Sequence, residues 1–162
     1  MEEITPDRAR LQEFLERWSR LAQDASAPGT VLVVEGVKDR EALDSLGLKA
    51  SIERIHAGRS LAAFSHAVGL HYRRAILLTD WDRAGGTLAR RLTLLLRADG
   101  IEVDLVHRQE IGRATRGEIV HVEGLATWIL HLVDAVGTAW ATELARWHLP
   151  VPAADSARGP TG

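Results

Sequence analysis

The chain has 162 residues, of which 46% are hydrophobic and 26% charged, and its formal net charge is −2. This length and composition are typical of a globular domain with a hydrophobic core. The sequence contains no cysteine, which excludes disulfides, thiolate metal sites and a cysteine nucleophile. The net charge argues against a surface that is basic throughout. Contact with nucleic acid would therefore need a local basic patch or bound cations.

No targeting or membrane segment is expected. The sequence has no run of about 18 apolar residues, which a membrane-spanning helix would need. Its N-terminus, MEEITPDRAR, is acidic and polar, unlike a secretory signal peptide. With the absence of cysteine, these features favour a cytoplasmic location.

The N-terminal segment 5–25 is predicted to form an amphipathic helix, capped by Thr5 and with Pro6 at its first position. The chain then alternates between short apolar runs, typical of buried strands, and stretches typical of helices. Predicted strands cover residues 30–36, 51–58, 75–80 and 101–106. Predicted helices between them cover residues 39–47, 60–69 and 83–100, with Asp39 and Ser60 as N-caps.

This alternation predicts an α/β, Rossmann-like fold with a mainly parallel four-stranded sheet and helices on both faces. Beyond Gly117 the sequence again becomes helical, over 123–137 and 138–149. The predicted organisation is an N-terminal helical extension at 1–28, an α/β domain at 29–135, a C-terminal packing helix at 136–149 and a disordered tail at 150–162.

Acidic side chains follow two of the predicted strands. Glu35 ends the first strand, and Asp80 and Asp82 end the third. Because ligands of parallel α/β sheets bind beyond the carboxyl ends of the strands, we expect the three carboxylates to converge there. Clustered like charges are costly unless cations neutralise them, and carboxylate oxygens suit Mg²⁺ or Mn²⁺. The sequence thus predicts a divalent metal site, where an ion can polarise a phosphate or activate water.

Several further residues are expected around this edge of the sheet. Gly85 and Gly86 open a helix whose N–H groups can receive a phosphate. Trp81 alternates with the aspartates and is expected to pack under a helix rather than stack on a base. Basic residues near the same edge are candidates to hold phosphates: Lys38, Arg59, Arg83 and Arg108. His56 and His107, at strand ends, are candidates to join the site, and the arginine pairs at 73–74 and 90–91 are interpreted as solvated.

A hydrophobic strand that ends in Glu35-Gly36, followed roughly forty-five residues later by one that ends in Asp80-x-Asp82-x-x-Gly85, resembles the Toprim domain. That domain is shared by topoisomerases, bacterial primases, some repair and overcoming-lysogeny nucleases, and the ribonuclease that matures 5S ribosomal RNA. The resemblance covers residues 5–135 and is nearest to the small stand-alone archaeal Toprim proteins. These also match at Asp39 and at the late VEGL stretch, residues 122–125. The α/β domain at 29–135 is accordingly identified as the Toprim part.

The resemblance implies phosphodiester chemistry that depends on Mg²⁺, or on Mn²⁺. It implies that Asp80 and Asp82 hold the metal and that Glu35 is a general base or acid and a further ligand. Asp39 and Glu123 match additional acidic positions. The chain lacks the tyrosine setting of topoisomerases, the zinc module of primases and the RNA-docking domain of the 5S maturase, so the resemblance leaves the substrate open.

Three functions are compatible with these residues. The first is a metal-dependent nuclease or phosphotransferase acting on RNA or DNA, with a protein partner supplying specificity. The second is a non-catalytic nucleic-acid-binding or assembly factor on a Toprim scaffold. The third is a phosphatase, because residues 79–88 also resemble the opening motif of the haloacid-dehalogenase-like family; here that motif follows the third strand rather than the first. The intact trio Glu35, Asp80 and Asp82 favours the first function, since a scaffold has no need of clustered like charges.

Overall fold

The structure is a computed structural model and describes residues 4–137 and 141–146. Four parallel strands form one sheet in the order β2-β1-β3-β4. The strands are β1 (Thr30–Val34), β2 (Ile52–Arg54), β3 (Arg74–Leu77) and β4 (Glu102–Asp104). The helices are α1 (Pro6–Ala25), α2 (Val37–Ser45), α3 (Leu61–His71), α4 (Arg83–Ala98), α5 (Val106–Ala114), the 3-10 helix η1 (Val122–Gly124), α6 (Leu125–Val136) and α7 (Ala141–Arg146). The α/β fold predicted from the sequence is confirmed.

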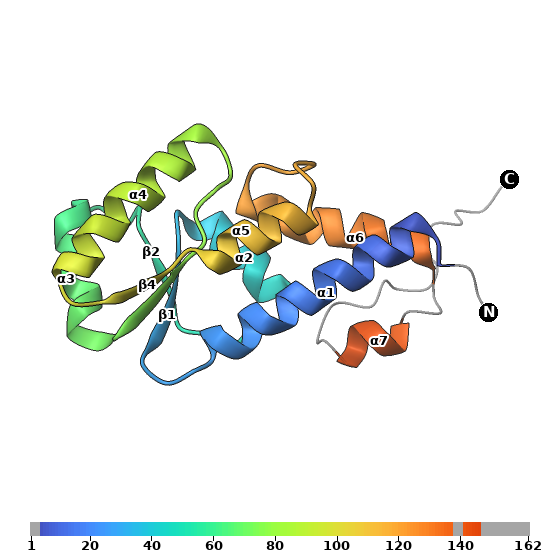
Figure 1. Ribbon diagram of the computed structural model, residues 1–162, viewed down its shortest axis with the longest axis horizontal. Coiled ribbons are helices and arrows are strands. Elements are labelled where there is room, and N and C mark those ends of the chain that lie inside the picture. The colour runs from blue at the N-terminus through green and yellow to red at the C-terminus, as the bar shows by residue number, and fades with distance from the viewer. Residues whose placement is uncertain (1–3, 138–140, 147–162) are drawn as a thin grey trace, which may run out of the picture.

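Helices cover both faces of the sheet (Figure 1). The side chains of β1 alternate between two cores, as expected for a strand buried on both sides. Leu32 and Val34 pack with α1, α2, α5 and α6, whereas Val31 and Val33 pack with α3 and α4. The N-terminal helix shares the first core, where the ring of Phe14 stacks on Trp18 at a centroid distance of 5.7 Å.

Two local predictions are corrected. Helix α5 was not predicted. Residues 101–106 were assigned to the fourth strand, and the residues from there to Gly117 were given no secondary structure. In the structure Asp104 ends β4, and its Oδ1 accepts hydrogen bonds from the N–H groups of Val106 and His107, which starts the helix. Helix α2 begins two residues earlier than expected: Gly36 is its N-cap, and Asp39 lies in its first turn. The N-caps Thr5 and Ser60 are confirmed.

At the C-terminal end, the structure describes α7 over residues 141–146, within the helix predicted at 138–149. Leu144 of α7 is fully buried in the same core as α1 and α6. The predicted tail at 150–162 lies outside the described residues. In the part of the chain that the structure describes, no helix is long and apolar enough to cross a membrane.

Candidate metal centre

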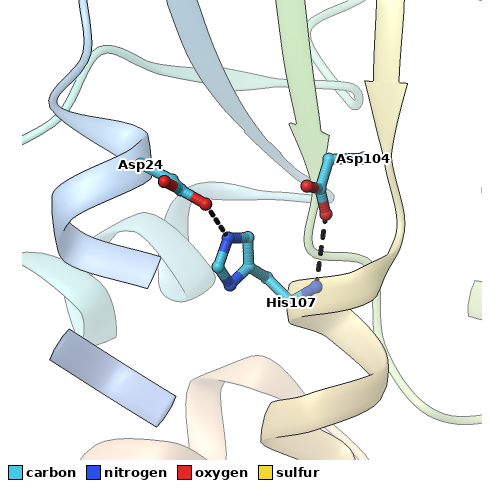
Figure 2. A group of neighbouring side chains, drawn as sticks. All are labelled: Asp24, Asp104 and His107. Carbon is cyan, nitrogen blue, oxygen red and sulfur yellow. Dashed lines mark hydrogen bonds and ion pairs between the residues drawn. The ribbon is translucent and has the colours of Figure 1, made fainter. Parts of the chain in front are cut away.

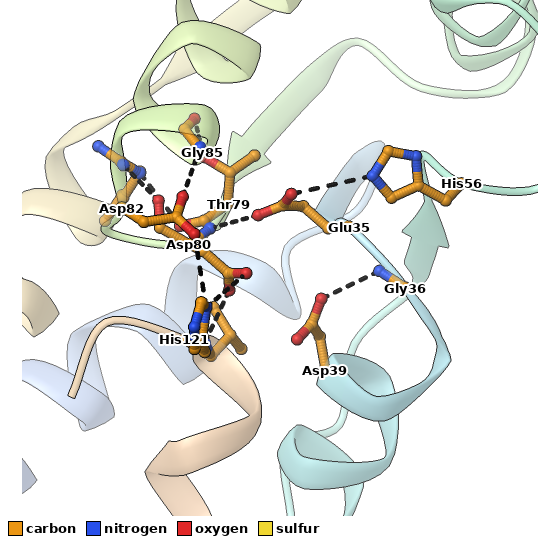
Figure 3. A network of polar contacts seen from close by, with 11 residues as sticks. Glu35, Gly36, Asp39, His56, Thr79, Asp80, Asp82, Gly85 and His121 are labelled. Carbon is orange, nitrogen blue, oxygen red and sulfur yellow. Dashed lines mark hydrogen bonds and ion pairs between the residues drawn. The ribbon is translucent and has the colours of Figure 1, made fainter.

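Glu35, Asp80 and Asp82 come together beyond the C-terminal ends of β1 and β3 (Figure 3). These strands are parallel neighbours with Val33 opposite Leu77, so the residues that follow them meet at one edge of the sheet. The backbone N–H of Asp80 donates to Glu35 Oε2 at 2.7 Å. The predicted convergence of carboxylates from two strands is therefore present in the structure.

Each of the three carboxylates has one oxygen held by a backbone N–H and the other near a histidine. Asp80 Oδ1 accepts from Val122 N–H at 2.8 Å, and its Oδ2 lies 3.1 Å from His121 Nδ1. Asp82 caps α4 by accepting from Gly85 N–H at 2.7 Å, and its Oδ2 lies 3.6 Å from the same Nδ1. Glu35 Oε1 lies 3.8 Å from His56 Nε2. Backbone donors thus fix the orientation of the carboxylates before any ligand binds.

His121 is the residue of this centre that the sequence analysis missed. It lies in the loop between α5 and α6, and its imidazole faces both aspartates (Figure 3). No periodicity marks it; the available signal was its place directly before the VEGL stretch at 122–125. The hydrogen bond that the imidazole donates to the Asp80 carboxylate, together with the charges of Asp80 and Asp82, raises the pKa of His121.

The donor set fits a divalent cation. Three residues, Asp80, Asp82 and His121, each offer one ligand atom. These three atoms lie within 4.8 Å of one another, a separation that one ion can bridge. Two carboxylates with an imidazole suit Mn²⁺ well, and the carboxylates alone suit Mg²⁺. Among the described residues Glu35 is not a member of this group.

Glu35 is the largely buried carboxylate of the centre. Its side chain is 16% exposed. Burial raises the pKa of its carboxyl group, and the neighbouring charge of Asp80 raises it further, against the opposing hydrogen bond from the Asp80 backbone. A raised pKa moves a carboxyl group toward the range in which a general acid or base operates.

Asp39 and Glu123 border the centre. Asp39 is buried, and its Oδ2 accepts from Gly36 N–H at 3.0 Å, so it stabilises the start of α2. Burial raises its pKa, and the charges of Asp80 and Glu123 add to the effect. Glu123 is exposed in η1, which leads directly into α6 as expected for an acid at a helix start.

The role expected for the two glycines is corrected. A Cβ at Gly85 would lie 2.0 Å from the carbonyl oxygen of Asp80, so only glycine permits the close approach of α4 to this loop. The N–H of Gly85 donates to the Asp82 side chain and that of Gly86 to the Asp82 carbonyl. Both N–H groups are thus already used within the protein, rather than being open to a phosphate.

Of the predicted basic residues, Arg108 makes hydrogen bonds to the loop that carries Asp80. From α5 it donates to the carbonyl of Thr79 through Nε at 3.1 Å and to that of Asp80 through Nη2 at 2.5 Å. Burial lowers its pKa, whereas the charges of Glu35, Asp80 and Asp82 raise it. It therefore both supports the loop and adds positive charge beside the carboxylates.

The other predicted basic residues are exposed. Arg83, in the first turn of α4, lines a pocket of about 550 Å³ together with Glu35 and His56. Lys38 is exposed in the first turn of α2. The guanidinium of Arg59 lies over the ring of Phe64, 5.2 Å from its centroid.

Trp81 packs under a helix, as predicted. Its backbone N–H donates to the Val120 carbonyl, and its Nε1 donates to the Arg108 carbonyl, each at 2.7 Å. The indole packs against the core that α5 helps to form. These contacts join the loop after β3 to the loop before η1, and so help to bring His121 to the aspartates.

His107 does not join the centre, which corrects the expectation from its position near a strand end. It is 7% exposed, and its Nε2 lies 2.6 Å from Asp24 Oδ2 at the end of α1 (Figure 2). Arg74 Nη2 lies 2.7 Å from Asp104 and 3.9 Å from Asp24. The Arg74 guanidinium therefore neutralises the charge of the two carboxylates. Asp24, Arg74, Asp104 and His107 form a polar network that connects α1 to the end of β4. Arg74 is accordingly not the solvated residue that was expected.

The fold and this centre define a parallel α/β protein with a carboxylate–histidine cluster at the C-terminal edge of its sheet. The chain belongs to the UPF0292 family. It is 32% identical over 143 residues to the UPF0292 protein of Methanosarcina acetivorans, covering 88% of this chain and 98% of that relative. It is 35% identical over 114 residues to the UPF0292 protein of Thermococcus gammatolerans, covering 70% and 81%.

No protein-family model matches the sequence. A solved structure of a protein from Aquifex aeolicus superposes with a TM-score of 0.55 at 22% identity, covering 70% of this chain and 96% of that one. At this identity the likeness concerns the fold alone.

Proposed function

We propose that this protein is a Toprim-type enzyme of nucleic-acid phosphodiester chemistry, a small nuclease or phosphotransferase that depends on Mg²⁺ or Mn²⁺. The observation that carries the proposal is the convergence of Glu35, Asp80 and Asp82 from two neighbouring strands, with one oxygen of each held by a backbone N–H. Holding like charges together costs stability, and a bound cation would offset that cost. The proposal includes a cytoplasmic location and a protein partner that supplies substrate specificity.

The residues divide into roles by their geometry. Asp80, Asp82 and His121 would hold the cation, because their ligand atoms lie within reach of one ion. Glu35, whose pKa is raised by burial, would transfer a proton to or from a reacting oxygen. The cation, when bound, supplies Lewis-acid stabilisation of the charge on the phosphate. Arg108 and Arg83 would contact phosphate oxygens.

A specific observation also supports the second candidate, a non-catalytic nucleic-acid-binding or assembly factor. Every carboxylate of the centre already makes a hydrogen bond that shapes a loop or caps a helix. A scaffold protein would need these bonds as much as an enzyme would. The raised pKa of Glu35 favours the enzyme, since a scaffold gains nothing from it.

Cleavage assays test the proposal. Purified protein with Mg²⁺ or Mn²⁺ is incubated with labelled structured RNAs and with single- and double-stranded DNAs. We expect Asp80→Asn and Glu35→Gln to lower the rate of cleavage by about 100-fold or more. Asp44→Asn, at the exposed end of α2, is the charge-matched control and should retain the wild-type rate.

Two results would contradict the proposal. Unchanged cleavage in both Asp80→Asn and Glu35→Gln would exclude this centre as the active site. Binding without cleavage of any substrate would support the scaffold function instead.

A further inference from the structure

A second recess borders the centre. A pocket of about 720 Å³ lies between α4, α5 and the loop after α5. Its apolar surface includes Trp81, Leu105 and Ile119, and its cationic surface consists of Arg90, Arg108, Arg113 and Arg116. Arg108 also donates to the carbonyls of Thr79 and Asp80, so it borders both the pocket and the centre. None of the described residues that line the pocket is acidic.

Three arginines of the pocket, Arg90, Arg113 and Arg116, make only long ion pairs or hydrogen bonds within the protein. Arg113 is 62% exposed and lies 3.6 Å from Glu110, whereas Arg116 is 58% exposed and lies 3.6 Å from Glu13. Arg90, on α4, donates to the hydroxyl of Thr87 at 3.3 Å. Exposed ion pairs contribute little free energy, so these guanidinium groups can turn toward another anion. Planar guanidinium groups are suited to phosphate oxygens, which they can contact through two N–H donors.

Arg116 holds an unusual backbone conformation. Its φ is +54°, and it is the one non-glycine residue with positive φ among those that the structure describes. The left-handed region costs an L-residue about 1 to 2 kcal/mol relative to glycine. Arg116 directly follows Thr115, the C-cap of α5, where a left-handed residue ends the helix, and its side chain lines the pocket.

We propose that this pocket binds a nucleotide of a single-stranded nucleic acid whose neighbouring phosphate lies at the metal centre. This inference rests on the proposed function and specifies its substrate. The volume suits a nucleotide. The base would contact the apolar surface, while Arg90, Arg113 and Arg116 would contact phosphate oxygens. A base must be unpaired to reach such a surface, which selects a single strand over a duplex.

The test is a binding measurement that does not depend on the metal or on cleavage. Fluorescein-labelled oligothymidylate is titrated with protein in EDTA, and anisotropy is recorded at several salt concentrations. The double variant Arg90→Gln/Arg113→Gln should bind about tenfold more weakly, and the slope of log K against log salt should fall by about one per arginine removed. Arg97→Gln, exposed in the last turn of α4, is the matched control and should bind like the wild type.

Arg116→Gly separates binding from folding. Glycine relieves the positive φ, so the melting temperature should stay constant or rise while the affinity for oligothymidylate falls severalfold. A structural role for Arg116 would instead lower the melting temperature.

Three results would overturn the proposal. The double variant could bind oligothymidylate with the affinity and salt slope of the wild type, or the wild type could fail to bind oligothymidylate at all. Binding of a duplex could also depend on these arginines as strongly as binding of the single strand does. A stronger dependence of polyglutamate binding on them would assign the pocket to an acidic protein partner and overturn it too.

The two proposals fail independently. If the arginine substitutions leave oligothymidylate binding in EDTA unchanged while cleavage still depends on Asp80, only the proposed nucleotide pocket is overturned. Absence of any cleavage, with oligothymidylate binding that depends on the arginines, would overturn the enzyme and leave a single-strand-binding surface.

Discussion

The backbone N–H of Asp80 donates a hydrogen bond of 2.7 Å to Glu35 Oε2, which joins the loop after β3 to the end of β1. The same residue, Asp80, accepts from Val122 N–H through its side chain. The proton-transfer candidate, the metal-ligand candidates and the loop before η1 are thus positioned together. A change that displaces the Asp80 loop should disturb all three.

Gly85→Ala tests this coupling. A Cβ at position 85 would lie 2.0 Å from the Asp80 carbonyl oxygen, so the loop must move. We expect a loss of about 3 kcal/mol in the free energy of unfolding, measured by urea denaturation, together with weaker Mn²⁺ binding. Gly86→Ala is the control: its Cβ would meet only the ends of arginine side chains, at 3.8 and 4.0 Å, and stability should be unchanged or rise by up to about 1 kcal/mol. Equal stability of both variants would contradict the close approach.

His121→Ala tests whether the imidazole is a ligand. Imidazole nitrogen suits Mn²⁺ better than Mg²⁺, which prefers oxygen. Calorimetric titration should therefore show a drop in Mn²⁺ affinity of roughly tenfold and a smaller drop for Mg²⁺. His131→Ala, exposed on α6, should bind both ions as the wild type does. An unchanged or increased Mn²⁺ affinity in His121→Ala would show that this histidine only neutralises the aspartates.

Three groups of the centre should make the metal-free protein less stable as the pH rises above their ordinary pKa values. The pKa values of Glu35 and Asp39 are raised, so the folded state binds more protons than the unfolded state just above their ordinary pKa, and stability falls with pH there. The pKa of His121 is also raised, so its stabilising contribution is complete below about pH 6.5 and is lost as the pH passes the folded-state pKa.

Asp80→Asn isolates this effect, because the Asp80 charge contributes to all three shifts. Urea denaturation in EDTA at several pH values should give a flatter pH dependence for the variant than for the wild type. The pKa of His121, followed by NMR, should fall in the same variant. An identical His121 titration in both proteins would contradict the contact with Asp80.

Arg108→Lys should weaken the Asp80 loop. The guanidinium serves two carbonyls through separate nitrogen atoms, and a single ammonium group cannot reproduce that fork. We expect a loss of about 1 to 3 kcal/mol in the free energy of unfolding and a lower cleavage rate. Arg113→Lys, exposed on the same helix, should change stability by less than about 0.5 kcal/mol. Equal effects of the two substitutions would argue against the bridging role of Arg108.

Glu35, Asp80 and Asp82 could be assigned to one site before the structure, because each follows a solidly apolar run and parallel strands bring their carboxyl ends together. The start of α2 and the existence of α5 were harder to predict from the sequence. Asp39 looks like an N-cap in sequence, yet the N-cap is Gly36, three residues earlier, and the Asp39 carboxylate accepts from Gly36 N–H inside the first turn. Helix α5 was missed because its start depends on the Asp104 side chain rather than on an apolar repeat.

The sequence by itself determined the parallel α/β fold and the convergence of the three carboxylates. Short apolar runs identify the buried strands, and parallel strands bring their carboxyl ends to one edge of the sheet. Only the tertiary structure decided which histidine meets them. His121 lies 41 positions from Asp80 and reaches it through contacts of the loop before η1, whereas His107, next to a strand end, turns to Asp24 on α1, 83 positions away. Such pairings depend on how helices pack across the sheet, and no local pattern of residues encodes that packing.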